Sequence, residues 1–278
     1  MGKDCSAGCV KQKGKCVPAA AAPATPVAKA DMLMRKRTID SCLKAADIYE
    51  ANAAQSTGAD AAAFQLQAAD ALNCAMRIKT TGNILLLEGT LDTPPNKKFW
   101  AQHGPRALGL VRAAKAAHAP YKSDASAAAI EMDSFMYQAS SKGMLRQALT
   151  GAGVTFLKLA DDLVSNHHSF DGYVGHCYLG GFYTAAPWPL QDRKRGLKEM
   201  EAAYQASPKV RRNGYYACLL RYMHDDYEGA VSACQYALDK GRCDGPTQPD
   251  YCAFLTLETK RMLNLAVFKG FSAQRKKK

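Results

Sequence analysis

The amino-acid sequence predicts an all-α fold, an α-solenoid of about ten to twelve antiparallel helices. Three observations lead to this prediction: an internal repeat of 34 residues, an abundance of alanine, and apolar residues spaced as on one face of a helix. Alanine occupies 48 of the 278 positions, and it has the highest helix propensity of all residues. No apolar run approaches the roughly 18 residues that a membrane-crossing helix needs. We therefore expect a soluble or peripheral membrane protein without a transmembrane segment. The sequence does not determine its compartment, and an organelle is one of the options.

Two segments superimpose at a separation of 34 residues. Residues 192–204 read DRKRGLKEMEAAY, and residues 226–238 read DYEGAVSACQYAL. The aligned pairs are Asp192 with Asp226, Gly196 with Ala230, Met200 with Cys234, and Ala203 with Ala237. Thirty-four residues is the period of a two-helix repeat unit, which cannot bury its apolar faces without a neighbouring unit. The small residues recur where two helices are expected to approach closely.

The helix expected before the first copy completes such a unit. Leu179-Gly180-x-x-Tyr183 is similar to the Leu-Gly-x-x-Tyr core of a tetratricopeptide A-helix, and Pro208 closes the repeat. In the second copy, residues 215–219 (YYACL) supply apolar bulk without the Leu-Gly pair. The chain thus resembles a tetratricopeptide-like helical repeat protein.

A second resemblance depends on the turn between the two helices of the first copy. This turn is longer than usual, because it includes Thr184 to Leu190 (TAAPWPL). With the preceding residues GFY, this segment resembles the T-component family of TRAP transporters, which are tetratricopeptide-like helical proteins. A more distant resemblance is to helical regulators of microtubule dynamics. The similarity covers about residues 172–238, with a weaker echo at 83–89.

The transporter resemblance implies a ligand-holding cavity between helices, with aromatic residues of the first repeat in its wall. The alternative is that these aromatic residues, which recur at helical spacing, belong to the core. The candidate ligand- or partner-binding residues are Tyr178, Phe182, Tyr183, Trp188, Asn213 and Tyr216.

The elements before the repeats follow from apolar spacing and breakers. A first long helix begins near Asp31 and ends at Thr57-Gly58, and Asp60 begins a second helix. Residues 80–96 form a connection, and Pro94-Pro95 precede a helix that Gly104-Pro105 interrupt. The apolar stripes of the first two helices are Ile39, Leu43, Ala46 and Ala53, and then Phe64, Ala68, Leu72 and Ala75.

Two helices are expected within 123–149, joined near Gly143, and another at 154–165. After the repeats, Gln248-Pro249-Asp250 begin a last helix that covers the end of the stack. No segment predicts a strand. The chain is expected to divide into three parts: a disordered basic, Cys/Ala/Pro-rich tail over 1–30, a helical-repeat domain over 31–268, and a basic tail over 269–278. Within the domain the clearest repeats are at 172–208 and 209–241, and a capping helix is at 249–268.

The net charge of +12 is concentrated at the two ends of the chain. Residues 1–37 and 269–278 together carry +11, which leaves +1 on residues 38–268. A nucleic-acid-binding domain gathers Lys and Arg on one structured face, and the nearly neutral body disfavours that class. The basic ends fit solvated tails or contacts with an anionic membrane surface.

The ten cysteines show no metal-binding spacing. Five of them fall on expected helix faces, where free cysteine behaves as a small apolar residue: Cys42, Cys74, Cys177, Cys218 and Cys234. Cys243 and Cys252 bracket a turn and could form a disulfide in an oxidising compartment. We expect no metal and no cofactor.

The first six residues, MGKDCS, match the N-myristoylation pattern at Gly2, with Cys5 as a candidate for palmitoylation. The alternative is an ordinary exposed tail.

Two functions remain open, and neither is enzymatic, because no catalytic motif is present. The first is a helical-repeat scaffold that contacts other proteins, as a peripheral subunit of a larger membrane-associated complex, for example in a plastid or mitochondrion. The second is a carrier of a small hydrophobic ligand or a transport accessory protein, as the transporter resemblance implies.

Overall fold

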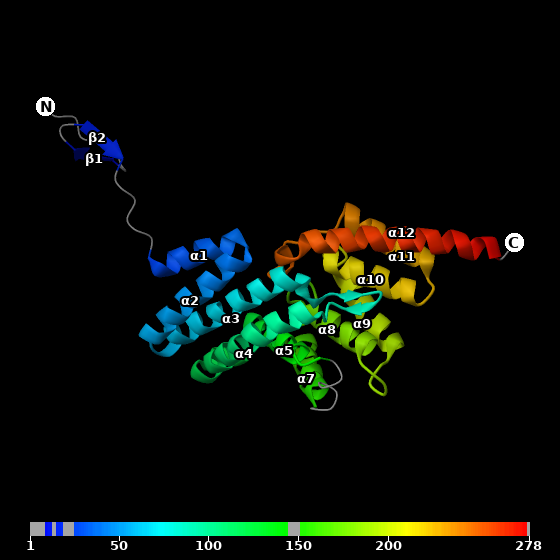
Figure 1. The fold of residues 1–278 in the computed structure, drawn as a ribbon, viewed down its shortest axis with the longest axis horizontal. Helices are drawn as coiled ribbons and strands as arrows, with labels where there is room; N and C mark the ends of the chain where they lie inside the picture. Colours follow the sequence, from blue (N-terminus) through cyan, green and yellow to red (C-terminus); the bar gives the residue numbers. More distant parts are fainter. Residues whose placement is uncertain (1–8, 13–14, 19–24, 144–150, 277–278) are drawn as a thin grey trace.

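The computed structural model describes residues 9–12, 15–18, 25–143 and 151–276. Within these ranges the protein is almost entirely helical, as predicted, and forms α1 to α5 and α7 to α12, three short 3-10 helices and two small hairpins (Figure 1). None of the helices described combines the length and the hydropathy that crossing a bilayer requires.

The first half of the structure is a group of alanine-rich helices. Their bounds are Pro26–Lys36 (α1), Ile39–Gln55 (α2), Gly58–Thr80 (α3), Pro94–Ala117 (α4) and Ala125–Ser140 (α5). Side chains of Thr25, Thr38, Thr93 and Asp124 accept hydrogen bonds from backbone N–H groups at the starts of α1, α2, α4 and α5, and these bonds fix where the helices begin. Small residues let α2, α3 and α4 pack closely around Trp100, which is fully buried.

A short hairpin between α3 and α4 packs against the second half of the structure. The 3-10 helix η1 (Thr81–Asn83) is followed by strands β3 (Leu85–Leu86) and β4 (Gly89–Thr90), which pair in an antiparallel register. Ile84 and Leu85 are buried in the core of the second half. The hydroxyl of Tyr215 donates a hydrogen bond of 2.8 Å to the Leu85 carbonyl oxygen.

The second half begins with α7 and ends with a long helix at the edge of the molecule (Figure 1). The bounds are Ala152–Asn166 (α7), Val174–Ala185 (α8), Arg193–Ala206 (α9), Arg211–Met223 (α10), Tyr227–Asp239 (α11), Gln248–Asp250 (η3, a 3-10 helix) and Cys252–Lys276 (α12). Each of the two aligned sequence segments forms one helix, α9 and α11. Asp192 and Asp226 occupy equivalent positions, because each caps the start of its helix through its side chain.

The close approach expected at Gly196 is present. A Cβ atom on Gly196 would lie 2.4 Å from Thr184 Oγ1 and 3.1 Å from the Gly180 carbonyl oxygen of α8. The other members of the aligned pairs that face the core are also buried, namely Met200, Ala203, Ala230, Cys234 and Ala237.

Several expectations about elements were wrong. Gly104 and Pro105 do not interrupt α4, which continues through both residues. Gly104 packs directly against α5, since a Cβ atom added to it would lie 2.8 Å from the Gln138 backbone nitrogen. Four short strands occur, the two above and β1 (Cys9–Gln12) with β2 (Lys15–Pro18). The tail expected over 1–30 contains these two strands and the start of α1, and the tail expected over 269–278 contains the end of α12.

The expectation of free, apolar cysteines was wrong for four of the five helix-face residues. Disulfides join Cys42 to Cys74, linking α2 to α3, and Cys218 to Cys234, linking α10 to α11. Sequence spacing concealed these pairs because the partners come from different helices. A third disulfide joins Cys243 to Cys252, the pair that bracketed a turn in the sequence. Among the described cysteines Cys177 is free and buried.

Candidate ligand-binding cavity

A cavity of about 170 Å³ lies where the two halves of the structure meet. Its wall is mainly apolar and aromatic, and it draws on α3, α5, α7, α8, α10 and the segment around η3. The rings of Phe156 and Phe182 stack at a centroid distance of 5.4 Å, and Phe156 meets Tyr178 edge to face at 6.3 Å. Pro187 and Leu190, which are exposed, place the opening of the cavity at the loop between α8 and α9.

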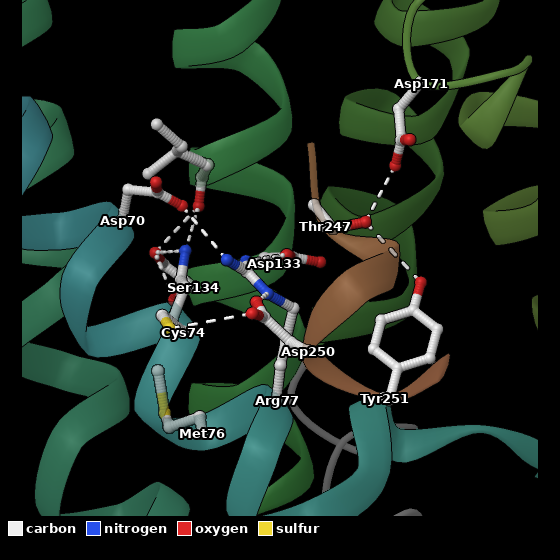
Figure 2. Close-up of polar contacts among 12 residues, drawn as sticks. Asp70, Cys74, Met76, Arg77, Asp133, Ser134, Asp171, Thr247, Asp250 and Tyr251 are labelled. Carbon is white, nitrogen blue, oxygen red and sulfur yellow. Dashed lines mark hydrogen bonds and ion pairs between the residues drawn. The ribbon is translucent and has the colours of Figure 1, made fainter. Parts of the chain in front are cut away.

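One side of the cavity is formed by a buried ionic cluster around Arg77 of α3 (Figure 2). The Arg77 guanidinium lies 2.8 Å from an Asp133 oxygen, 2.6 Å from an Asp250 oxygen and 3.1 Å from an Asp70 oxygen. Arg37 forms a second ion pair with Asp250. One arginine therefore holds carboxylates from α3, α5 and η3 together, and these attractions raise the pKa of Arg77 further above its ordinary value, against the opposing effect of burial.

A second buried ion pair lies on another side of the cavity. Arg212 Nη1 of α10 is 2.9 Å from an oxygen of Asp171, whose second oxygen accepts a hydrogen bond from the side-chain amide of Gln248. The Thr247 hydroxyl donates to Asp171 at 2.7 Å and also approaches the Tyr251 hydroxyl, as Figure 2 shows. Both charges of this pair are thus compensated within the protein.

Four polar atoms of the cavity-lining residues are buried and have no hydrogen-bond partner in the described structure: Asn83 Oδ1, Asp92 Oδ1, Tyr137 OH and Arg212 Nε. Tyr137 is fully buried, and Arg212 is only 3% exposed. A buried polar group without a partner costs about 1–3 kcal/mol, so native proteins rarely leave one unpaired. Four such atoms belong to residues that line this one cavity.

Burial shifts the pKa values of the titratable side chains that line the cavity. It raises the pKa values of Tyr137, Tyr178, Tyr216 and Tyr251 above that of an ordinary tyrosine, so all four hydroxyls stay neutral. Burial also raises the pKa of Asp92, while the nearby Lys97 acts in the opposite direction. The neutral hydroxyls can both donate and accept hydrogen bonds.

The Asp133 carboxylate is held by Arg77 and by a hydrogen bond from the Tyr178 hydroxyl. Burial nevertheless raises the pKa of Asp133 above its ordinary value. The Cys177 thiol of the wall likewise has a raised pKa because it is buried, which disfavours the reactive thiolate.

Three of the six candidate binding residues line this cavity: Tyr178, Phe182 and Tyr216. Trp188 lies on the surface with 89% of its area exposed. The Tyr183 ring lies under the Arg195 guanidinium, with Arg195 Cζ 4.1 Å from the centroid of the ring. The Asn213 amide donates to the carbonyl oxygens of Gly172, Ala203 and Ser207, and so it ties the loops around α8 to α10.

Sequence reasoning missed the polar half of the site, which comprises Arg77, Asn83, Asp92, Asp133, Tyr137 and Arg212. These residues come from three separate segments, 77–92, 133–137 and the start of α10, and no local motif connects the segments. One signal was available in α5, where Glu131, Asp133 and Ser134 interrupt a largely apolar run, AAAIEMDSFMY. A polar pair at a buried helix position needs partners from other helices.

The lipidation candidates Gly2 and Cys5 lie outside the described residues. The residues that the structure describes contain no group of three or more His, Cys, Asp or Glu side chains placed to hold a metal ion. Comparison with known proteins adds no family: no protein-family model matches the chain, and no curated protein is significantly similar to it.

Proposed function

We propose that this protein binds one small, uncharged, largely apolar molecule in the cavity, without chemical conversion. The observation that carries this proposal is the set of four unpartnered polar atoms on residues that line a mainly apolar cavity. An apolar pocket with a few convergent polar groups is the usual form of a small-molecule site. The role corresponds to the ligand carrier that the sequence left as the second possibility.

The charges around the cavity favour an uncharged ligand. Arg77 faces three carboxylates, Arg212 faces Asp171, and Asp92 lies near Lys97. A charged ligand would therefore bring an unpaired charge into a poorly solvated site, which is costly. Asn83 Oδ1 is an acceptor only, so the ligand's polar end should be a hydrogen-bond donor such as a hydroxyl or amide.

The volume limits the size of the ligand. A dry protein cavity of roughly 150 Å³ holds one benzene molecule, and the cavity here has about 170 Å³. We therefore expect a molecule with a single ring or an equivalent aliphatic body, with its ring beside Phe156 and Phe182 and its hydroxyl toward Tyr137.

The test is calorimetric titration of the protein with p-cresol, toluene and benzoate. We expect p-cresol to bind, toluene to bind more weakly because it lacks the donor, and benzoate to bind least because of its charge. Gly181 of α8 lines the cavity and has open space around an added Cβ, so Gly181→Leu should fill the cavity and abolish binding.

Gly109→Leu is the matched control, because Gly109 lies within α4, is exposed and also has open space around it. This variant should bind p-cresol as the unmodified protein does. The proposal fails if none of the three compounds binds, or if Gly181→Leu binds as well as Gly109→Leu.

We also propose a repeat architecture for the second half of the structure. The pairs α8–α9 and α10–α11 are proposed as successive units of a tetratricopeptide-like α-solenoid, on the basis of the equivalent caps at Asp192 and Asp226 and the buried small residues between them. The scaffold role, with protein partners in a membrane-associated complex, stays a prediction, since no contact in the described structure favours it.

A further inference from the structure

The outer face of α12 carries three of the most exposed large apolar side chains in the described structure. Leu257, Phe268 and Phe271 are 62%, 68% and 65% exposed. Because an α-helix has 3.6 residues per turn, Phe268 and Phe271 lie about three and four turns beyond Leu257 on nearly the same side. Val267, also exposed, lies beside them.

The opposite face of α12 accounts for its position in the fold. Leu255, Met262 and Ala266 are fully buried in the core that α12 shares with α10 and α11. The exposed residues therefore point away from the protein, and α12 lies along its edge (Figure 1). Burying the two phenylalanines needs a surface that the described residues do not provide.

The charges along α12 have one sign. Residues 257–278 contain seven Lys or Arg residues and a single acidic residue, Glu258. Glu258 is buried and paired with Arg261, which also contacts Glu88. Lys260 and Lys269 are exposed on the helix itself, and the remaining four are the residues RKKK at 275–278.

Acidic groups from α11 lie beside the end of α12, because Tyr227 packs against Gly270. They do not reverse the charge of this face. Asp226 is engaged in capping α11, and Asp225 accepts a hydrogen bond from the Tyr227 hydroxyl. Glu228 is an exposed acid in the first turn of α11, a single charge compared with the seven Lys and Arg residues of 257–278.

We infer that the outer face of α12 docks on an anionic lipid surface, with Phe268 and Phe271 inserted at the level of the headgroups. Exposed aromatic residues flanked by Lys and Arg form the pattern of helices that lie in a membrane interface, and basic residues are attracted by the negative potential of anionic lipids. Stable protein interfaces bury about 1,200–2,000 Å² in total, and four apolar side chains on one narrow helix face fit a lipid surface better. This docking is independent of the ligand cavity.

The test is co-sedimentation of the full chain with vesicles of phosphatidylcholine containing phosphatidylserine. We expect binding to phosphatidylserine vesicles, little binding to pure phosphatidylcholine, and weakening with added salt because salt screens the attraction. Changing Phe268 and Phe271 together to Ser should lower the affinity at least about tenfold, since burial of each ring contributes more than a tenfold factor.

Trp188→Ser is the matched control, because Trp188 is the most exposed aromatic residue described and lies on the α8–α9 loop. It should leave vesicle binding unchanged, and all variants should keep the helical circular dichroism spectrum. Absence of binding by the unmodified chain overturns the inference. So does equal binding by the double variant, which would assign any attachment to another part of the chain.

Discussion

Two fully buried tyrosines, Tyr137 and Tyr215, differ in the hydrogen bonding of their hydroxyl groups. Tyr215 donates its hydroxyl proton to the Leu85 carbonyl oxygen at 2.8 Å, whereas the hydroxyl of Tyr137 has no partner in the described structure. The Tyr137 ring packs near Trp100, with centroids 5.9 Å apart, so its position is fixed by the core. Within the described structure the hydroxyl of Tyr137 therefore contributes no hydrogen bond to stability, and under the proposed function it contacts the ligand.

Changing Tyr137 to Phe should therefore leave the free protein as stable as before, or more stable by up to about 1 kcal/mol, because an unsatisfied buried hydroxyl is removed. The same variant should bind p-cresol about tenfold more weakly, since one hydrogen bond to the ligand is lost. Urea unfolding measures the first effect and calorimetry the second.

Tyr215→Phe is the control and should behave in the opposite way. It removes a satisfied hydrogen bond and leaves a buried carbonyl unpaired, so it should lose roughly 1 kcal/mol of stability and keep its affinity for p-cresol. A Tyr137→Phe variant that is less stable than Tyr215→Phe would show that the Tyr137 hydroxyl has a structural role.

The sequence could identify only part of the site at this scale. Tyr178, Phe182 and Tyr216 were accessible because they lie at helical spacing within the repeat region. Arg77 and Asp133 were not, since their pairing depends on how α3 and α5 pack, and no local pattern encodes it. Trp188 does not join the cavity wall, because the loop turns it toward solvent, and its role in binding a partner stays a prediction.

At the scale of elements, the small residues that the sequence aligns at a spacing of 34 lie on α9 and α11, and a close approach between helices restricts side-chain size. A Cβ atom added to Gly180 would lie 2.7 Å from Met200 Cγ, and one added to Gly196 would lie only 2.4 Å from Thr184 Oγ1 of α8. These contacts explain why glycine and alanine recur at the aligned positions, and the sequence displays that recurrence directly.

Replacing Gly196 with Leu should separate α8 from α9 and destabilise the fold by roughly 1–3 kcal/mol through overpacking. Ala230→Leu should have a similar effect, because Ala230 is fully buried. Lys198→Leu, at an exposed position of the same helix, should change stability little. Thermal unfolding of the three variants provides the measurement, and equal melting temperatures would refute this register.

Other elements could not be predicted from their sequence. α4 contains Pro105 and continues because contacts with α3 and α5 outweigh the local preference to break. The β3–β4 hairpin carries only two residues in each strand, too few for a period to be visible. The disulfides within the helical pairs depend on the approach of two helices, and such bonds are typical of oxidising compartments.

At the scale of the whole molecule, the cavity exists because two groups of helices meet at a buried ionic cluster. Arg77 of α3 contacts Asp133 of α5 and Asp250 of η3, which lie 56 and 173 positions further along the chain. The cluster therefore links the first half of the chain to the segment that precedes α12. The ligand site and the junction of the two halves share this arginine.

Changing Arg77 to Met should destabilise the protein by about 3–5 kcal/mol, because buried carboxylates lose their common partner. Arg106→Met is the control: Arg106 also pairs with two carboxylates, those of Asp47 and Glu50, but its side chain is 37% exposed. That variant should lose less than about 1 kcal/mol. Similar losses for both variants would show that burial does not determine the contribution of the Arg77 cluster.

The pH dependence of the Arg77→Met variant gives a second measurement. Burial already raises the pKa of Asp133, and Arg77 opposes that rise, so the pKa of Asp133 should increase further without Arg77. A carboxyl whose pKa is higher in the folded than in the unfolded state binds more protons when folded, and folding then gains stability as the pH falls through the folded pKa. The stability difference between the variant and the unmodified protein should therefore shrink from pH 7 toward about pH 4, near the ordinary pKa of Asp. A difference that stays constant over this range would mean that the lost free energy comes from packing of the arginine side chain and not from the charge it neutralises.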